Sequence, residues 1–377
     1  MKILHITAAY KPAFIYGGPT MSVAMLCEEL AGAGIESRVF TTTANGKTEL
    51  PVATDTPVNI DGVPVRYFKR LTKDHTHFSP ALLNAVWEHA RDFDIIHIHA
   101  WWNLVSVLAC GIALGRKVPV VVSPRGMLSS YTFGSRNMGA KSIIHKLMGK
   151  RYLDKSHIHT TSAHESRAVE KLLQPLSVTE LPNFVKLDEL RPEYTQPAES
   201  VFKLLFFSRI EEKKGLDILI NALKTIDVPY HLTIAGTGDD AYINHLKTLA
   251  ADVAGNITWA GFYGDDKFEL LQQHHLLVLP SHDENFGNVV VESLSVGTAV
   301  LISENVGLAG YVLSENLGWV CQTNTASVSD AINNIAQNQH QQLAQIRQTA
   351  PGRVREHFTG TALAIRYIEF YRTILQK

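Results

Sequence analysis

Short apolar runs alternate with helix-like stretches between Met1 and Pro182. Runs of this length are typical of buried strands, and a strand–helix alternation predicts a parallel sheet covered on both faces. A helix is expected from about Thr20 to Ala33. The predicted strands are Lys2–Thr7, Ser37–Thr42, Asp94–His99, Val118–Ser123, His157–Thr160 and Val178–Leu181.

The same alternation begins again at Lys203. We therefore expect two α/β, Rossmann-like domains, at residues 1–182 and 203–357, facing each other across a cleft where ligands commonly bind. The predicted strands of the second domain are Lys203–Ser208, His231–Ala235, Ile257–Ala260, Leu276–Leu279 and Ala299–Ile302.

Two other segments complete this organisation. Residues 183–202 are polar and contain Pro192 and Pro197, which predicts an interdomain linker. The last helical pattern, Thr361–Leu375, follows Pro351-Gly352. We expect this helix, at about 358–377, to cross back to the first domain.

Composition narrows the class of protein. The chain has 377 residues, 45% of them hydrophobic, and a formal net charge of −1. No global field favours nucleic acid as a partner. The three cysteines fit no disulfide or zinc framework, which favours a reducing compartment. With no signal peptide and no apolar stretch long enough to span a bilayer, the sequence predicts a soluble, cytoplasmic protein.

The most informative stretch runs from Ser281 to Glu292, where an apolar strand gives way to a helix. Gly287 allows close backbone approach, and a helix N-terminus offers N–H groups to an anion. We expect Glu284 to accept hydrogen bonds from hydroxyls beside that anion and Glu292 to reach a diol further along. A phosphate flanked by two sets of hydroxyls describes a nucleotide sugar, although two solvated acids on a surface loop are the alternative. The residues between them that are expected to bind the donor are Asn285, Phe286, Gly287 and Asn288.

Other candidates for donor binding follow predicted strands. Gly17-Gly18 opens the first helix and permits close approach of a phosphate, or it forms an ordinary tight turn. Arg209 and Lys214 flank a loop in the second domain, where two cations would stabilise a departing diphosphate without a metal, or they belong to a surface loop of mixed charge. The remaining donor candidates are Gly236, Gly238 and Phe262. Asp92-Phe93-Asp94 looks like a metal-binding Asp-x-Asp, but it precedes a strand, and we interpret it as a solvated turn.

A second group of candidates points to the acceptor. His97 and His99 share one face of a strand, and Trp101 and Trp102 come just after it. His99 and the two tryptophans could contact a sugar, whereas His97 is expected in the core. The alternative places all four in packing.

Arg125 follows the next predicted strand and is a candidate for stabilising developing negative charge. Residues 127–153 contain basic residues and no acid, including Arg136, Lys141, Lys146 and Arg151. This pattern is either a solvated face or a basic amphipathic helix near 141–151 that contacts the cytoplasmic membrane face or a lipid-linked acceptor.

Together these residues resemble the family 4 retaining glycosyltransferases of GT-B architecture, also called glycosyl transferases group 1, over nearly the whole chain. The resemblance rests on Gly17-Gly18, Arg209 with Lys214-Gly215, Gly236-x-Gly238, Leu181-Pro182-Asn183, and Glu284-x-Phe-Gly with Glu292.

The resemblance implies transfer of a hexose-type sugar from a nucleoside-diphosphate donor to a saccharide or lipid-linked saccharide, with retention, no metal and no cofactor. Such a reaction suits polysaccharide or glycoconjugate biosynthesis. It also implies that Arg209, Lys214 and Gly18 contact the diphosphate, Glu284 the sugar hydroxyls and Glu292 the ribose. Arg125 stands where many members have a catalytic histidine, which leaves Arg125 and His99 as candidates for that role.

Two other functions fit the same residues. A nucleotide-sugar epimerase or hydrolase would process the donor without an acceptor. A catalytically inactive protein would bind the donor and do nothing further.

Overall fold

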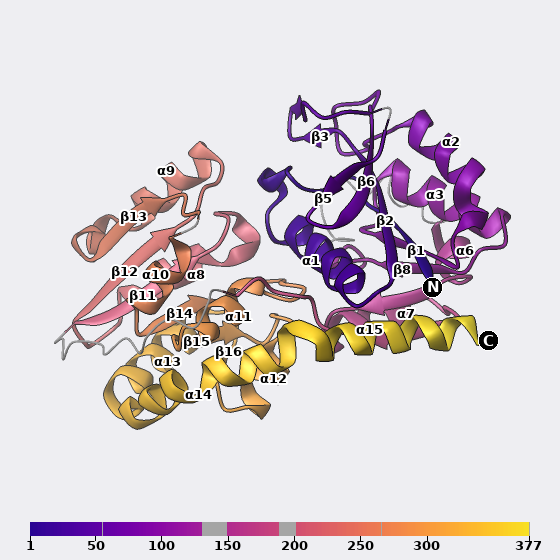
Figure 1. The fold of residues 1–377 in the computed structure, drawn as a ribbon. Coiled ribbons are helices and arrows are strands. Elements are labelled where there is room, and N and C mark those ends of the chain that lie inside the picture. The colour runs from indigo at the N-terminus through magenta and orange to yellow at the C-terminus, as the bar shows by residue number, and fades with distance from the viewer. Residues whose placement is uncertain (55, 130–148, 188–200, 265, 377) are drawn as a thin grey trace. The chain divides into compact units, whose positions relative to one another are not determined.

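The computed structural model describes residues 1–54, 56–129, 149–187, 201–264 and 266–376. The chain divides into two compact units, Met1–Lys186 with Phe358–Lys377, and Leu187–His357. Each is an α/β unit built on a largely parallel sheet, as the strand–helix alternation predicts (Figure 1).

The described part of the first unit forms an eight-stranded sheet in the order β10-β9-β8-β7-β1-β2-β6-β5. All neighbouring strands are parallel except β5 and β6. The strands are β1 (Lys2–Ile6), β2 (Glu36–Thr42), β5 (Val58–Ile60), β6 (Val63–Phe68), β7 (Ile95–His99), β8 (Val120–Ser123), β9 (His157–Thr160) and β10 (Ser177–Glu180). A separate hairpin joins β3 (Ala44–Asn45) to β4 (Thr48–Glu49). The hairpin, β5 and β6 were not predicted from the sequence.

Helices connect these strands and cover the sheet. They are α1 (Gly18–Gly32), α2 (Pro80–His89), α3 (Leu104–Gly115), α6 (Lys150–Leu153), α7 (Ala163–Leu172) and α15 (Gly360–Leu375), with 3₁₀ turns η1 (Phe14–Tyr16) and η2 (Ala90–Asp92). In the basic segment predicted near 141–151, residues 141–148 lie outside the described residues. Asp92 and Asp94 are exposed around η2, as expected of a solvated turn.

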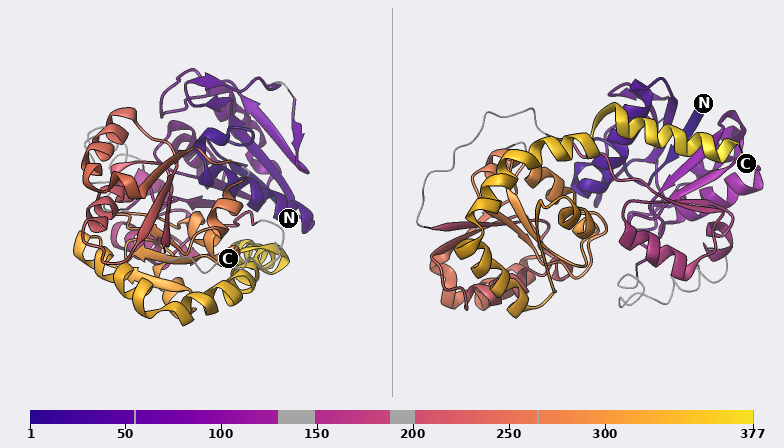
Figure 2. Two further views of the ribbon diagram at one scale, coloured as in Figure 1. Left: turned by 90° about the vertical axis from the view of Figure 1, so that its left-hand side faces the viewer. Right: turned by 90° about the horizontal axis from the view of Figure 1, so that it is seen from below.

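The C-terminal helix belongs to the first unit. Its apolar residues recur at helical spacing, and Leu363, Tyr367 and Tyr371 pack in a buried cluster with Ile3 of β1 and Leu26 of α1. Helix α15, in yellow, runs beside α1 in both sets of views (Figure 1, Figure 2). The expected return of this helix to the first domain is confirmed.

The residues just after β10 also belong to this unit rather than to a linker. Phe184 and Val185 are buried, and the Phe184 ring stacks on Tyr367 with centroids 5.5 Å apart. The sequence prediction that the linker begins at 183 was therefore too early, because an apolar pair follows Pro182. Residues 188–200 lie outside the described residues.

The described part of the second unit forms a six-stranded parallel sheet in the order β13-β12-β11-β14-β15-β16. The strands are β11 (Phe202–Phe207), β12 (Tyr230–Ala235), β13 (Ile257–Gly261), β14 (Leu276–Leu279), β15 (Ala299–Ser303) and β16 (Gly318–Cys321). The helices are α8 (Leu216–Leu223), α9 (Asp240–Leu249), α10 (Lys267–Gln272), α11 (Asn288–Ser295), α12 (Ala309–Ser314), α13 (Thr325–Asn338) and α14 (His340–Phe358), with 3₁₀ turns η4 (Glu212–Lys214) and η5 (Ala251–Asn256). Of the six strands described in this unit, five were predicted and β16 was not.

Each sheet has one place where the strand order reverses. In the first unit β1 lies between β2 and β7, and in the second β11 lies between β12 and β14. The chain builds outward from the first strand on one side and later returns to its other side. Ligands of such sheets bind at this reversal, outside the carboxyl ends of the strands. Candidate residues that lie at these two places are therefore the best placed to contact a ligand.

Candidate functional site

In the second unit, the reversal point brings together two of the predicted site residues. Lys214 ends η4, which follows β11, and Glu284 lies in the loop after the neighbouring strand β14. The Lys214 ammonium group donates a hydrogen bond to Glu284 Oε2. The side chain of Lys214 is 8% exposed and that of Glu284 is 19% exposed. An acid and a base 70 positions apart thus form one nearly buried ion pair.

This ion pair lies at the start of α11. Gly287 precedes the helix with φ of +91°, and a Cβ built there would lie 3.5 Å from Cγ of Glu284. The Glu284 backbone is held on both sides, since its N–H donates to Asn305 and its C=O accepts from Gly307. Phe286 is buried beneath the turn. The first N–H groups of α11, from Asn288 onward, begin next to the ion pair, and such N–H groups favour an anion.

A second acid, Glu292, lies on α11 itself and also has a partner. Glu292 Oε1 accepts a hydrogen bond from Lys267 Nζ at 2.8 Å. Lys267 begins α10 and was not identified from the sequence, because nothing in the order of residues places α10 beside α11. Lys213 and Asp283 form a further pair at 3.4 Å. Adjacent lysines therefore meet adjacent acids, and this matched Lys-Lys and Asp-Glu pattern is a signal that the sequence did contain.

Arg209 follows β11 as predicted, but its side chain is 67% exposed and its ion pair is with Glu211, at 2.7 Å. It does not share the Lys214–Glu284 pair. Arg209 is thus accessible to an incoming anion, and its side chain is paired with Glu211 and not with Lys214 or Glu284.

Gly236 and Gly238 have a structural explanation. A Cβ at Gly236 would lie 1.8 Å from the Ser208 carbonyl oxygen, and one at Gly238 would lie 2.1 Å from that of Ile210. The loops after β11 and β12 are in backbone contact here, so each glycine is required by the protein itself. The close approach of these two loops accounts for both glycines by itself, and donor binding at Gly236 and Gly238 stays a prediction.

Phe262 is 78% exposed and follows Gly261, which has a positive φ of 72°. Its ring is accessible.

In the first unit, Gly17 has a φ of +67°, and a Cβ there would meet nothing within 4 Å. Gly18 is the first residue of α1 and is exposed. A side chain at Gly17 would thus meet open space just before a helix N-terminus, and phosphate binding at this glycine pair stays a prediction.

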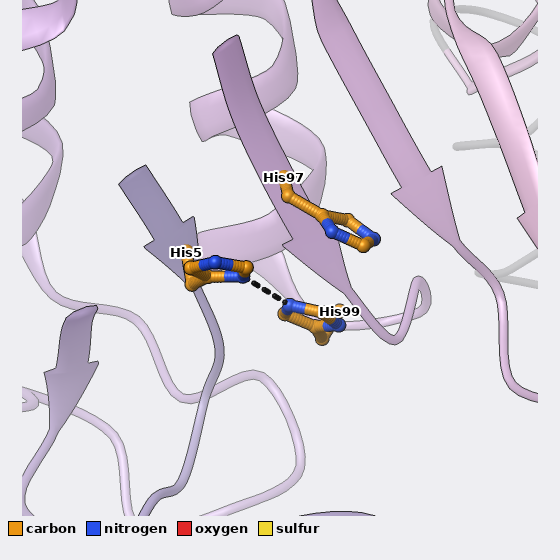
Figure 3. A group of neighbouring side chains, drawn as sticks. All are labelled: His5, His97 and His99. Atoms are coloured by element: carbon orange, nitrogen blue, oxygen red, sulfur yellow. Dashed lines mark hydrogen bonds between the residues drawn. The ribbon is translucent and has the colours of Figure 1, made fainter. Parts of the chain in front are cut away.

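The reversal point of the first unit carries a histidine cluster (Figure 3). His5 lies on β1, and His97 and His99 share one face of β7. His5 Nδ1 and His99 Nε2 are hydrogen-bonded at 3.0 Å, and the two rings stack. His5 and His159 were not predicted, because the register between strands decides which side chains meet.

His97 is part of a continuous hydrogen-bond chain. His159 Nε2–H donates to the Leu181 carbonyl, so His159 Nδ1 accepts from the Ser123 hydroxyl, at 2.6 Å. Ser123 Oγ accepts from His97 Nε2–H at 2.6 Å, and His97 Nδ1 accepts from the Tyr371 hydroxyl at 2.7 Å. Each ring nitrogen of His97 and His159 therefore donates or accepts one hydrogen bond with both rings uncharged. The expectation that His97 is a core residue agrees with this packing.

The imidazole rings of the cluster are uncharged near neutral pH, because their pKa values are lowered. Burial, followed by the charge of Arg125, lowers the pKa of His5 to about 3. Burial and the surrounding histidines hold the pKa values of His97 and His99 well below the ordinary value. His5, His97 and His99 place ligand atoms within 4.8 Å of one another. His5 Nδ1 and His99 Nε2 are bonded to each other, both nitrogens of His97 have partners, and a guanidinium lies beside the cluster, so we assign it no metal.

Arg125 lies just after β8 and contacts the same cluster. Its Nη1 donates to Asn183 Oδ1 at 3.0 Å, and its Nη2 lies 3.5 Å from His99 Nδ1. Glu165 fixes the loop, because its buried carboxylate accepts from the N–H of Gly126 at 2.6 Å and from that of Thr161 at 2.8 Å. Sequence reasoning missed Glu165, although the Ser162-x-x-Glu165 spacing is the signature of a helix N-terminus.

Trp101 and Trp102 do not form an open stacking surface. Trp101 is completely buried in the core cluster that includes Leu128 and Val105. The expectation that Trp101 meets an acceptor is therefore corrected: the chain turns after β7 so that this ring packs inward. Trp102 is partly buried, and its Nε1–H donates to the Met127 carbonyl.

The described helices include no segment that is long and apolar enough to cross a membrane.

Comparisons with known proteins match both units. The family "Glycosyl transferases group 1" matches residues 189–353, and the family "Glycosyl transferase 4-like domain" matches residues 17–183. A glycogen synthase of Geotalea uraniireducens is 31% identical over 125 residues, which are 33% of this chain and 26% of that protein. The matches span only 26% to 56% of the length of the glycogen synthases.

Solved structures share the fold over the whole chain. Sucrose-phosphate synthase from Thermosynechococcus elongatus superimposes with a TM-score of 0.75 at 18% identity, covering 100% of this chain and 99% of that one. The HepE protein of Anabaena, solved in complex with UDP and glucose, gives a TM-score of 0.71 at 19% identity, covering 99% of this chain and 100% of that one. The paired α/β units and the two family matches agree: the chain belongs to the group 1, family 4-type glycosyltransferases, with the GT-B fold.

Proposed function

We propose that this glycosyltransferase moves a hexose-type sugar, with retention at the anomeric carbon, from a nucleoside-diphosphate sugar to a saccharide or lipid-linked saccharide. The observation that carries the proposal is the Lys214–Glu284 ion pair beside the first turn of α11. Diphosphate and sugar hydroxyls need a cation, helix N–H groups and a carboxylate in one place, and this part of the second unit supplies all three.

In this proposal the second unit binds the donor. Lys214, exposed Arg209 and the N–H groups of α11 bind the diphosphate, while Glu284 accepts hydrogen bonds from the sugar. Glu292, one turn further along α11, accepts hydrogen bonds from the ribose, with Lys267 setting its position. Phe262 is accessible for contact with the base. HepE was solved with UDP, which makes uridine diphosphate the first probe to test, with guanosine diphosphate as the alternative base.

The bond between the anomeric carbon and the diphosphate breaks as the acceptor hydroxyl forms a new bond on the same face of the sugar. The proton of that hydroxyl leaves to a phosphate oxygen, which is the base nearest to that face. The leaving group gains negative charge in this step, and Lys214 and Arg209 stabilise it. We assign no divalent metal and no cofactor to the reaction.

We assign the acceptor to the first unit, at the reversal point marked by His99 and Arg125. His99 is held neutral, so it suits a hydrogen bond to a hydroxyl better than it suits a charge. A guanidinium stays protonated near neutral pH, so Arg125 acts as a cation and not as a base.

The test is product analysis by nuclear magnetic resonance, with UDP-glucose, UDP-galactose and GDP-mannose as donors and short saccharides and lipid-linked saccharides as acceptors. We expect a product that keeps the anomeric configuration of its donor and that forms only when an acceptor is present. An inverted product would refute retention. Conversion of the donor alone would indicate an epimerase or hydrolase instead.

A further inference from the structure

Arg125 is a partly buried cation that forms no ion pair with a described carboxylate. A guanidinium has five N–H donors. Of these, one donates to Asn183 Oδ1 at 3.0 Å and one lies 3.5 Å from His99 Nδ1, at the limit of a hydrogen bond. The Nε–H is buried and has no hydrogen-bond partner. No ion pair joins Arg125 to a carboxylate within the described ranges.

The surroundings do not neutralise this charge. The groups that its positive charge affects include His5, His97, His99 and His159, and each has a pKa lowered by burial, so each is uncharged near neutral pH. Glu165, on α7, is an acid whose charge favours the charged form of Arg125, but its oxygens accept from the backbone of Gly126 and Thr161 and form no ion pair with the guanidinium. A buried charge without a counter-charge is destabilising, and removing water from it lowers the pKa of Arg125 as well.

The backbone holds Arg125 in this place in spite of strain. Arg125 has a φ of +53°, in the left-handed region that residues other than glycine rarely occupy, and Gly126 follows with a φ of +78°. Such strain persists where the surroundings fix it and is frequent at ligand sites. Asn183 is buried beside the guanidinium, and its hydrogen bond with Nη1 holds that end of the Arg125 side chain in place.

The edge of the guanidinium formed by Nε and Nη2 lacks a strong hydrogen-bond acceptor. Nη1 is committed to Asn183, whereas Nε has no partner and Nη2 has only the long contact to His99. Nε and Nη2 point the same way in a planar fork, and this fork matches the two oxygens of a carboxylate or a phosphate. The location, just after β8 and against the cluster on β1 and β7, is the reversal point of the first sheet.

We propose that Arg125 and Asn183 form a binding site for an oxyanion, a phosphate or carboxylate, carried by the acceptor saccharide. This proposal rests on the acceptor-binding role given to the first unit above. The acceptor is then an acidic sugar, and the anion supplies the counter-charge that Arg125 lacks. The donor diphosphate is the other source of an oxyanion, and the experiment separates the two.

The test is calorimetric titration of the full-length protein with four probes: glucose 6-phosphate, glucuronate, inorganic phosphate and neutral glucose. Wild-type protein is expected to bind at least one charged probe and to bind it more tightly than glucose. Arg125→Gln is expected to weaken that binding about 10-fold or more, which is the effect of losing a charged hydrogen-bonded pair. Arg125→Lys keeps the charge but loses the fork, and we expect an intermediate loss.

Three controls make the result specific. Arg167→Gln removes an exposed arginine of α7 in the same unit and should leave probe binding unchanged. Lys214→Met removes the proposed donor cation, so loss of charged-probe binding in this variant but not in Arg125→Gln would place the oxyanion at the donor site and overturn the proposal. Binding of UDP and GDP should be the same in Arg125→Gln as in wild type, which also shows that this variant is folded.

Equal binding of charged probes to wild type and Arg125→Gln would overturn the proposal, and so would the absence of any charged-probe binding. Loss of UDP binding in folded Arg125→Gln or Arg125→Lys would assign the cation to the donor and would also overturn it. Failure of the donor assignment appears separately, in the Lys214 variant.

Discussion

Lys214 donates a hydrogen bond to Glu284 across neighbouring strand ends, so the cation proposed for the diphosphate is neutralised by the acid proposed for the sugar. The pair is nearly buried, which strengthens the attraction. A diphosphate that binds Lys214 must compete with Glu284, whose carboxylate then becomes available to sugar hydroxyls. One ion pair thus links the binding of both parts of the donor.

Glu284→Gln is predicted to separate these two effects. Without the carboxylate, Lys214 is no longer neutralised, so UDP or GDP should bind about 3- to 10-fold more tightly, as expected for loss of a competing ion pair worth about 1 kcal/mol. Turnover of the nucleotide sugar should fall, because the sugar loses a charged acceptor. Titration with the diphosphate and steady-state kinetics measure the two quantities. Weaker diphosphate binding would contradict the competition.

The ribose assignment of Glu292 gives a prediction about the ligand as well as the protein. Glu292→Ala should weaken UDP binding by about 10-fold, since a carboxylate hydrogen bond to a hydroxyl is worth about 1.5 kcal/mol. The same variant should bind 2′,3′-dideoxy-UDP as wild type does. A loss of equal size for both nucleotides would mean that Glu292 does not contact the ribose.

The glycines after β12 are predicted to act through stability. Gly236→Ala places a Cβ against the Ser208 carbonyl at a φ of +142°, so we expect a loss of about 2 kcal/mol in the free energy of unfolding. Gly255→Ala is the matched control in the same unit, because a Cβ there meets nothing within 4 Å. It should change stability by less than about 0.5 kcal/mol. Urea unfolding measures both, and equal stability of the two variants would contradict the close approach.

The buried histidines predict loss of stability in acid. The folded-state pKa values of His5 and His159 are about 3, against an ordinary value of 6.5 that applies to the unfolded chain. Below about pH 6.5 the unfolded state binds protons that the folded state excludes, so stability falls as the pH is lowered towards 3. Each such histidine removes up to about 1.4 kcal/mol per pH unit.

His159→Gln tests this effect. Glutamine can still donate to the Leu181 carbonyl but does not take up a proton. Urea unfolding between pH 7 and pH 4.5 should therefore show a shallower decline for His159→Gln than for wild type. Exposed His75→Gln is the control and should keep the wild-type slope. Identical slopes for His159→Gln and wild type would refute the origin of the acid sensitivity.

The sequence predicted most strands because parallel strands buried on both faces appear as unbroken apolar runs, such as Leu276–Leu279. It missed β6, in which exposed Pro64 and half-buried Arg66 alternate with buried Val63, Val65 and Tyr67. Such alternation is weaker evidence than a continuous run. It also missed β16, whose four residues begin with Gly318.

Parts of the candidate site were predictable and parts were not. Lys214 and Glu284 each follow a strand, and this much can be seen in the sequence. That β11 and β14 are neighbours is a property of topology, so the ion pair itself could not be predicted. The same holds for His5 beside His99, which depends on the pairing of β1 with β7. Trp101 was misjudged because position after a strand does not fix the direction of a side chain.

The most direct test of the account is the affinity of UDP and GDP for wild-type protein and for Lys214→Met, measured by calorimetry with EDTA present. Lys213→Met, which removes the neighbouring lysine of the Asp283 pair, is the matched control. The account predicts that wild type binds at least one diphosphate without a divalent metal. It also predicts that Lys214→Met weakens this binding by about 10-fold or more, and more than Lys213→Met does. Binding that requires a divalent metal, or that is the same in Lys214→Met and wild type, would contradict it.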